Sequence, residues 1–379
     1  RKAWFNTDTY EASDAESKRI GEEIASLNKD TVSRMLAKED NSAEVTRMLE
    51  IRQELGKTST KKYDAIETAV CPDGRVRGLL QFYGANRTGR WAGRLVQVQN
   101  LPRTYTEPLE LAREVVKKRS VGALKCIYGS VSDTLSQLIR TAFIAPQGKV
   151  LIDADFSAIE ARVISWLAKE EWRLDVFRTH GKIYEASASQ MFGVPFELIS
   201  KGNPEYALRQ KGKVAELALG YQGSSGALIA MGALDMGIPE EDLPDIVKRW
   251  REANKRIRDL WYAMDAAAVQ VISQGGSVAV NNILLSREYD ADLGVDFLTV
   301  RLPSGRKLYY NSPGLGVNQW GSPSITYMGI NDKNKWARIE TYGGKLVENC
   351  VQAIARDCLA QAIEKQGKCK ISKETETRI

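Results

Sequence analysis

The acidic stretch LIDADFSAIEARV, residues 151–163, carries carboxylates at a spacing that could bind a divalent metal ion. Asp155 ends a short apolar segment with the pattern of a buried strand, and Asp153 shares its strand face. Glu160 lies one turn into the helix that the following residues predict. A strand end fixes a carboxylate while the loop leaves positions open for water and phosphate oxygens, as Mg²⁺ requires. The alternative is a structural role, because Asp155 and Ser157 also suit helix capping.

A second group of chemically capable residues lies on the predicted helix of RQKGKVAELALGYQG, residues 209–223. Four-residue steps turn a helix by about 400°, so one stripe holds four of these residues: Arg209, Lys213, Leu217 and Tyr221. Two cations, an apolar side chain and an aromatic ring follow the order of a nucleoside triphosphate: phosphates, sugar and flat base. The spacing leaves open the alternative of a solvated basic end on an ordinary amphipathic helix.

A third group is the basic stretch NRTGRWAGRLVQVQNLPR, residues 86–103. Its arginines surround two amides, and the set is Arg87, Arg90, Arg94, Gln99, Asn100 and Arg103. Arginines bind phosphates, and amide side chains reach the minor-groove acceptors that all base pairs share. The stretch therefore favours sequence-independent contact with a nucleic-acid duplex, with a merely basic loop as the alternative.

Two other motifs carry no such prediction. The GKT within LGKTST is not a phosphate-binding P-loop, because the glycine that such a loop needs five residues before Gly56 is Ile51 here. His180 has no partner at catalytic spacing, so we expect an ordinary polar histidine. With one histidine and five cysteines that form no CxxC pair, a structural zinc site is not expected.

Length and composition indicate the size, the number of subdomains and the cellular compartment of the protein. The 379 residues are 43% apolar and 27% charged, which predicts a large core divided among two or three subdomains. A formal net charge of +6 is compatible with an anionic partner without requiring one. No apolar run reaches the length of a membrane span, the first residues lack the apolar core of a signal peptide, and the cysteines suit a reducing compartment. We therefore expect a cytoplasmic protein without a membrane partner.

The elements that must position these groups are mostly helical. Apolar residues at helical spacing predict helices over 13–55, over most of 171–295 with 245–272 as one long helix, and over 343–365. The apolar run at 148–156 predicts a strand that ends at Asp155. Alternation around Pro-Ser-Gly predicts a β-hairpin over 297–312.

Taken together and in this order, the three groups resemble the polymerase domain of family A DNA polymerases, and most of all its phage branch. In the first group, DFSAIEAR resembles motif A of that family. In the second group, RQKGKVAELALGYQG resembles motif B. The TGR at 88–90 and QNLP at 99–102 are similar to the primer-template contact region. YGGKLVENCVQAIARD is similar to the palm helix that precedes motif C. The resemblance runs from about Lys57 to Ala362.

The resemblance implies an α+β, mostly helical fold: a right-hand architecture with an antiparallel palm sheet, helical fingers and a partial thumb. It places a thumb-base-like helical part at 1–62, the palm at 63–170 and 296–379, and the fingers at 171–295. It also implies template-directed addition of deoxynucleotides to a primer 3′ end, with primer-template DNA and deoxynucleoside triphosphates as partners and two Mg²⁺ ions as cofactors.

The same resemblance implies roles around the reacting atoms. Asp155 is the expected catalytic metal ligand, with the carbonyl of Phe156 as a further ligand. Glu160 is the expected steric gate, crowding the sugar 2′ position against ribonucleotides.

For the incoming nucleotide, Arg209 and Lys213 are expected to hold the triphosphate, and Lys213 also to donate a proton to the pyrophosphate. Tyr221 is expected to pack at the templating base pair, with the following glycines letting the template strand pass close to the backbone. The expected DNA contacts are Arg87, Arg90, Gln99, Asn100 and Gln352.

The sequence departs from the family pattern at two places. Leu217 stands where many members carry Phe or Tyr facing the sugar, which predicts discrimination against 3′-deoxy analogues. After the helix over 343–365, the family continues into motif C, a His-Asp-Glu hairpin with the second metal ligand, whereas this sequence ends in QGKCKISKETETRI. Asp357 and Glu364 lie on the preceding helix and are not expected to replace it.

The second departure leaves several readings open. A second polypeptide could carry motif C, the sequence could be an interrupted gene or a shortened chain, or the protein could bind primer-template DNA without catalysis. A single-subunit RNA polymerase is a further alternative, which Glu160 argues against, because a gate that excludes the 2′-hydroxyl has no use there.

Overall fold

The computed structural model describes residues 27, 29–38, 41–56, 58–151, 154–317, 321, 323–331 and 333–366. Asp153 and the tail from Cys369 lie outside these residues, so the predicted strand face of Asp153 stays a prediction. The chain divides into two compact units. The first unit comprises residues 1–80 and 93–151, and the second comprises 81–92 and 152–379. None of the described helices is long and apolar enough to cross a membrane.

The first unit is built from short helices. In chain order these are α3 (Lys29–Leu36), α4 (Ala43–Gly56), α5 (Lys62–Ala69), α6 (Leu109–Lys117), α7 (Val121–Tyr128) and α8 (Val131–Leu138). Its small core joins Val96, Leu101 and Ile139. Tyr63 on α5 donates to the carbonyl of Leu135 on α8 at 2.8 Å, which ties two segments far apart in sequence.

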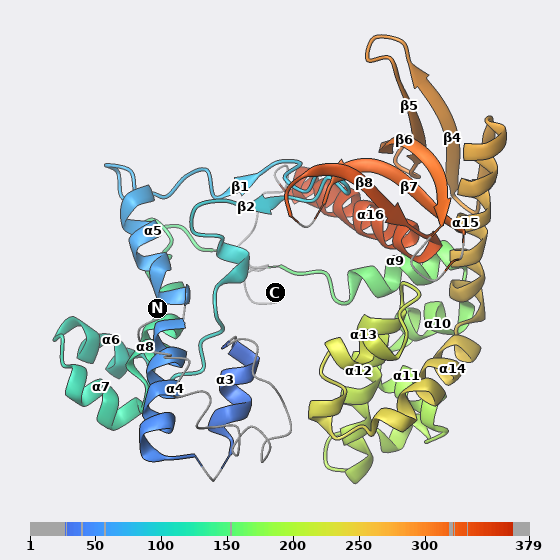
Figure 1. Cartoon of the computed structure of the whole chain (residues 1–379). Coiled ribbons are helices and arrows are strands. Elements are labelled where there is room, and N and C mark those ends of the chain that lie inside the picture. The colour runs from blue at the N-terminus through green and yellow to red at the C-terminus, as the bar shows by residue number, and fades with distance from the viewer. Residues whose placement is uncertain are drawn as a thin grey trace, which may run out of the picture. The chain divides into compact units, whose positions relative to one another are not determined.

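A six-stranded antiparallel sheet dominates the second half of the second unit (Figure 1). The strands are β3 (Ser277–Val280), β4 (Ile283–Asp290), β5 (Val295–Arg301), β6 (Lys307–Val317), β7 (Pro323–Ile330) and β8 (Trp336–Thr341). They follow one another as a simple meander, so every strand pairs with its neighbour in the sequence. The predicted hairpin over 297–312 is confirmed as β5 and β6.

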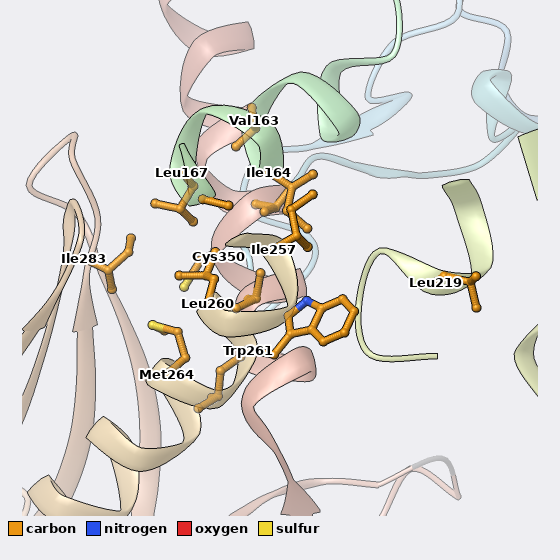
Figure 2. Packing of buried hydrophobic residues seen from close by; sticks show 14 of the residues in the cluster. Val163, Ile164, Leu167, Leu219, Ile257, Leu260, Trp261, Met264, Ile283 and Cys350 are labelled. Atoms are coloured by element: carbon orange, nitrogen blue, oxygen red, sulfur yellow. The ribbon is translucent and has the colours of Figure 1, made fainter. Parts of the chain in front are cut away.

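The helices of the second unit share one large core with this sheet. They are α9 (Ile159–Ala168), α10 (Glu171–Thr179), α11 (Ile183–Phe192), α12 (Leu208–Leu219), α13 (Ser225–Ala230), α14 (Leu243–Ala253), α15 (Lys255–Gln274) and α16 (Gly343–Gln366). Figure 2 shows side chains of α9, α15, α16 and β4 meeting in that core. The predicted helix over 343–365 is confirmed as α16.

Two predictions about the helical region are wrong. The single helix over 245–272 is broken between α14 and α15 at Asn254, which is fully buried and donates to the Trp250 carbonyl at 2.8 Å. An asparagine that bonds its own backbone offers the chain an alternative to continuous helix. The helical region also ends at Gln274 rather than at 295, because Gly275 takes a positive φ of 73° and ends α15.

The predicted strand over 148–156 is also not found in the described part of that segment, residues 148–151 and 154–156. A strand needs a hydrogen-bonding neighbour, and no described backbone pairs with this segment as a ladder. Val150 and Leu151 are 61% and 68% exposed, so their apolar pattern does not mark a buried strand.

The α+β class with an antiparallel sheet is confirmed. The proposed boundary between fingers and palm at 295/296 falls at the start of β5, inside the sheet that begins with β3. The names palm, fingers and thumb stay predictions, since the two compact units divide the chain at other positions.

Candidate active site

The carboxylate of Glu160 contacts residues from two other segments of the second unit. It lies in the first turn of α9. The phenol of Tyr221, just beyond α12, donates to its Oε2 at 3.2 Å. Arg90, from the segment 81–92, places NH1 at 3.7 Å from its Oε1, with both side chains partly exposed. The structure therefore brings together residues that are 61 and 70 positions from their partner in the sequence.

The phenol of Tyr221 stays protonated far above its ordinary range. Burial is the main cause, and the nearby Glu160 carboxylate adds to it, so the pKa of Tyr221 is raised strongly. A neutral phenol keeps its proton for donation, and a carboxylate is its natural acceptor. The pair therefore holds Glu160 in one orientation beside the end of α12.

Asp155 and Phe156 lie in the irregular segment before α9, and both are exposed. Neither Asp155 nor Ser157 caps α9, because the first helical residues follow Ala158 without a side-chain capping bond. None of the described residues forms a hydrogen bond or ion pair with the Asp155 carboxylate, and no group of three His, Cys, Asp or Glu among them gathers around it. Its oxygens are therefore available to a ligand from outside.

Arg209, Lys213 and Leu217 share one partly exposed face of α12, whereas Tyr221 follows the end of the helix and packs against the core. Gly212, Val214, Ala215, Ala218 and Leu219 are buried on the opposite side. On the stripe, Lys213 is half-buried without an acidic partner among the described residues, and Leu217 is 51% exposed. Arg209 is different, because its Nε donates to Glu185 Oε1 at 2.9 Å.

A buried ion pair that the sequence analysis did not identify connects α12 to α10 on the side of α12 that faces the core. Arg173 on α10 is 1% exposed and pairs with Glu216, whose side chain is 3% exposed. Glu216 also accepts from Ser187 at 2.8 Å and from the indole of Trp250 at 3.1 Å. Because every partner is satisfied, this network can hold the helix without an unpaired buried charge. An acid at position 216, on the face of buried Gly212, Ala215 and Leu219, was the available signal.

Gly212 explains how closely α11 and α12 approach each other. A Cβ atom there would lie 2.2 Å from the carbonyl oxygen of Tyr184 on α11. Only glycine allows this contact, although it weakens a helix interior by about 1 kcal/mol. The register of α11 against the stripe of α12 is therefore set by backbone contact.

The segment 81–92 is fastened to the sheet and α16 by arginines. Arg87 lies over the rings of Tyr310 and Tyr327, at 4.7 and 4.3 Å from their centroids, and donates to the Tyr309 carbonyl at 2.9 Å. Arg356 donates to the Gly89 carbonyl at 2.9 Å. Arg87 is therefore engaged by residues of the sheet, whereas Arg90 from the same segment contacts Glu160.

The remaining predicted residues fall into different surroundings. Gln352 on α16 donates to Glu348 at 3.2 Å. Asp357 accepts from Arg306 at 2.9 Å and from Ser304 at 2.6 Å. Gln99 and Asn100 belong to the short helix Val98–Asn100 of the first unit, where Asn100 donates to Gln97 at 3.2 Å.

The histidine set aside in the sequence analysis has an ordinary local role. His180 ends α10, its Nδ1 accepts from the backbone N–H of Lys182 at 3.1 Å, and its ring stacks on Phe196.

Comparison with known proteins adds independent information. The model of the family described as DNA polymerase family A matches residues 8–277. The DNA polymerase of Bacillus phage SP02 is 56% identical over 338 residues, which cover 89% of this chain and 51% of that protein. The thermostable DNA polymerase I of Thermus aquaticus is 28% identical over 188 residues, covering 49% of this chain and 21% of that protein. The chain thus spans about half the length of the phage relative.

A similar fold is found among solved structures. One of them is the POL domain of Pol1 from M. smegmatis, in complex with DNA primer-template and dNTP. The match has a TM-score of 0.52 and 18% identity, and it covers 90% of this chain and 46% of that chain.

Proposed function

The chain belongs to DNA polymerase family A, and from that premise we propose that it acts in template-directed DNA synthesis in a phage-type replication system. The reaction is phosphoryl transfer, in which a primer 3′-hydroxyl attacks an incoming deoxynucleoside triphosphate and releases pyrophosphate. The observation that carries this proposal is the convergence of Arg90 and Tyr221 on Glu160, at the end of the helix that presents Arg209 and Lys213.

The chain's own residues bind and orient the nucleotide in this proposal. Arg209 and Lys213 attract the triphosphate, since a guanidinium and an ammonium bind phosphate oxygens strongly. Leu217 lies next along the stripe, where the sugar would follow. Lys213 is placed to give a proton to the leaving pyrophosphate, and Tyr221 to pack against the templating pair.

Glu160 sets the choice of sugar in this proposal. Because Tyr221 and Arg90 hold its carboxylate, the side chain is a fixed obstacle rather than a mobile one. A fixed obstacle discriminates between sugars better than a flexible side chain, because moving Glu160 aside would break its contacts with Tyr221 and Arg90. A 2′-hydroxyl would therefore meet the carboxylate, while a deoxyribose would not.

A divalent metal fits the residues before α9. The exposed carboxylate of Asp155 and the backbone carbonyl of Phe156 are oxygen ligands of the kind that Mg²⁺ prefers. When bound, Mg²⁺ would supply charge neutralisation of the phosphates and activation of the primer hydroxyl. We further propose that the second carboxylate of a two-metal site comes from outside the described residues, for example from a second polypeptide.

Primer extension tests the proposal. The purified chain is given a primed template, deoxynucleoside triphosphates and Mg²⁺, beside Asp155→Asn and a matched surface control, Asp245→Asn. We expect extension by the parent and the control, and loss of two or more orders of magnitude in Asp155→Asn, because a metal ligand is removed. Primed-template binding without extension by any variant would contradict polymerisation by this chain and favour a DNA-binding half that needs a partner.

A further inference from the structure

Glu185 contacts the first cation of the α12 stripe. It lies on α11, with its side chain 12% exposed, and its Oε1 accepts from Arg209 Nε at 2.9 Å. The Arg209 side chain is 34% exposed, so the pair is partly screened from water and not a loose surface contact. The residue has no role in the function proposed above.

The contact uses only one edge of the guanidinium. An arginine carries five N–H donors, one on Nε and four on the two η nitrogens. Among the described residues, Glu185 is the sole hydrogen-bond acceptor for Arg209, and it takes the Nε–H. Both η nitrogens therefore keep their donors for a ligand, and phosphate is the ligand whose oxygens match that fork.

Neighbouring groups restrict where the guanidinium can go. Its carbon lies 5.5 Å from the ring centroid of Tyr184 and 6.0 Å from that of Tyr206. The backbone of Tyr184 is in close contact with Gly212, one turn along α12 from Arg209. Because α11 and α12 are locked together there, Glu185 has a fixed position relative to the start of the stripe.

We propose that Glu185 is a positioning residue for triphosphate binding. By holding Nε, it orients Arg209 so that both η nitrogens face the phosphates. The proposal rests on the function proposed above and adds a residue to it.

The opposite role would be competition, in which the carboxylate neutralises Arg209 and must be displaced by the triphosphate. A carboxylate that competes for the phosphate position would take the two-nitrogen fork of the guanidinium, which is the strongest arginine–carboxylate arrangement. Glu185 binds the Nε side alone. The geometry points to orientation.

Equilibrium binding tests this without relying on catalysis. The affinity of the complete chain for dATP is measured by calorimetry in the absence of DNA, for the parent and for each variant named below. Glu185→Ala should weaken binding about tenfold, which corresponds to one lost orienting contact. Glu185→Gln keeps an oxygen that accepts from Nε and should bind at least as tightly as the parent. Tighter binding by Glu185→Ala would overturn the proposal in favour of competition.

A double-mutant cycle separates positioning from a general structural effect. In an Arg209→Ala background, Glu185→Ala should have no further effect on affinity, because its target is gone. Equal losses with and without Arg209 would overturn the proposal. Should Glu185→Ala fail to fold, Glu185→Asp replaces it, since its shorter side chain cannot reach Nε and should weaken binding similarly.

Controls distinguish this inference from the proposed function. Asp245→Ala removes the partner of Arg249 at 2.6 Å on α14 and should leave dATP affinity unchanged. Loss of affinity in Arg209→Ala but not in Glu185→Ala would overturn the inference and leave the proposed nucleotide site standing. A parent chain that does not bind dATP would overturn both.

Discussion

The carboxylate of Glu160 contacts a phenol and a guanidinium from two other segments, and in the proposed function it is the side chain that selects the sugar. We expect Glu160→Ala to raise the use of ribonucleotides relative to deoxynucleotides by about tenfold or more, because the obstacle at the 2′ position is removed. The measurement is the ratio of kcat/KM for ATP and dATP in single-nucleotide primer extension.

Tyr221→Phe is the matched control for that change. It keeps the ring and the Glu160 carboxylate and removes only the 3.2 Å hydrogen bond. We expect a smaller rise in ribonucleotide use, because a carboxylate with one remaining partner is less rigid. An unchanged ratio in Glu160→Ala would show that the gate lies elsewhere.

Two buried groups, Cys350 and Tyr310, and the partly buried Tyr221 make the second unit sensitive to alkali. Burial raises the pKa of the Cys350 thiol to about 12, and it also raises the pKa values of the Tyr221 and Tyr310 phenols. The unfolded chain loses these protons above about pH 9 for the thiol and pH 10 for the phenols. The native state keeps them, so their contribution to stability is intact below pH 9 and falls as the pH rises further.

The expected result is a decline of about 1.4 kcal/mol per pH unit for each group that ionises in the unfolded chain alone. Urea unfolding of the second unit, followed from pH 8 to 11, measures it. Cys350→Ala should delay the onset towards pH 10, because only the phenols then contribute. A free energy of unfolding that stays constant over this range would contradict the assignment.

At the scale of elements, the segment 81–92 depends on α16 for its position. Arg356, with its side chain 9% exposed, lies over the rings of Phe82 and Trp91 at 4.9 and 4.7 Å and donates to the Gly89 carbonyl. A guanidinium that binds backbone and rings at once resists local opening. The position of Arg90 beside Glu160 therefore relies on a residue 266 positions away.

Arg356→Met tests this dependence, because it keeps the apolar stem and removes the charge and the donor. We expect a loss of about 1–3 kcal/mol in stability and faster amide hydrogen exchange across 81–92. Arg338→Met is the control, since Arg338 donates to the Ser312 carbonyl on the sheet, at 3.2 Å. Equal exchange of 81–92 in the parent and Arg356→Met would contradict the role.

At the scale of the whole molecule, two units with separate cores predict two unfolding transitions. The core of the first unit centres on Val96, Leu101 and Ile139, whereas the second unit buries a much larger cluster that includes Trp250 and Trp261. Stability grows with buried apolar area, so the first unit should unfold at the lower temperature.

Calorimetry with one core variant per unit checks this order. Ile139→Ala should lower the temperature of the first transition only, and Leu260→Ala that of the second only. Each variant should lose about 2–5 kcal/mol in the free energy of unfolding of its own unit, because each leaves a cavity in that core. A single transition that both variants shift equally would show that the units unfold together.

The sequence by itself determined the local features. The hairpin of β5 and β6, the helix α16 and the shared face of Arg209, Lys213 and Leu217 on α12 follow from alternation, helical spacing and turn residues within one segment. The order of the motif-like segments also identified the family. These signals are local, so a single segment contains enough information to read them.

Only the tertiary structure decided which charged residues are engaged and which are free. Arg87 and Asp357 have partners on other elements, and Asp155 is exposed in a segment predicted as strand. On α12, Arg209 pairs with Glu185 of α11 and Glu216 pairs with Arg173 of α10. Each outcome depends on contact between segments 24 to 240 residues apart, or on the lack of a pairing neighbour. Side-chain type and spacing do not encode those distances, because packing of separate elements sets them.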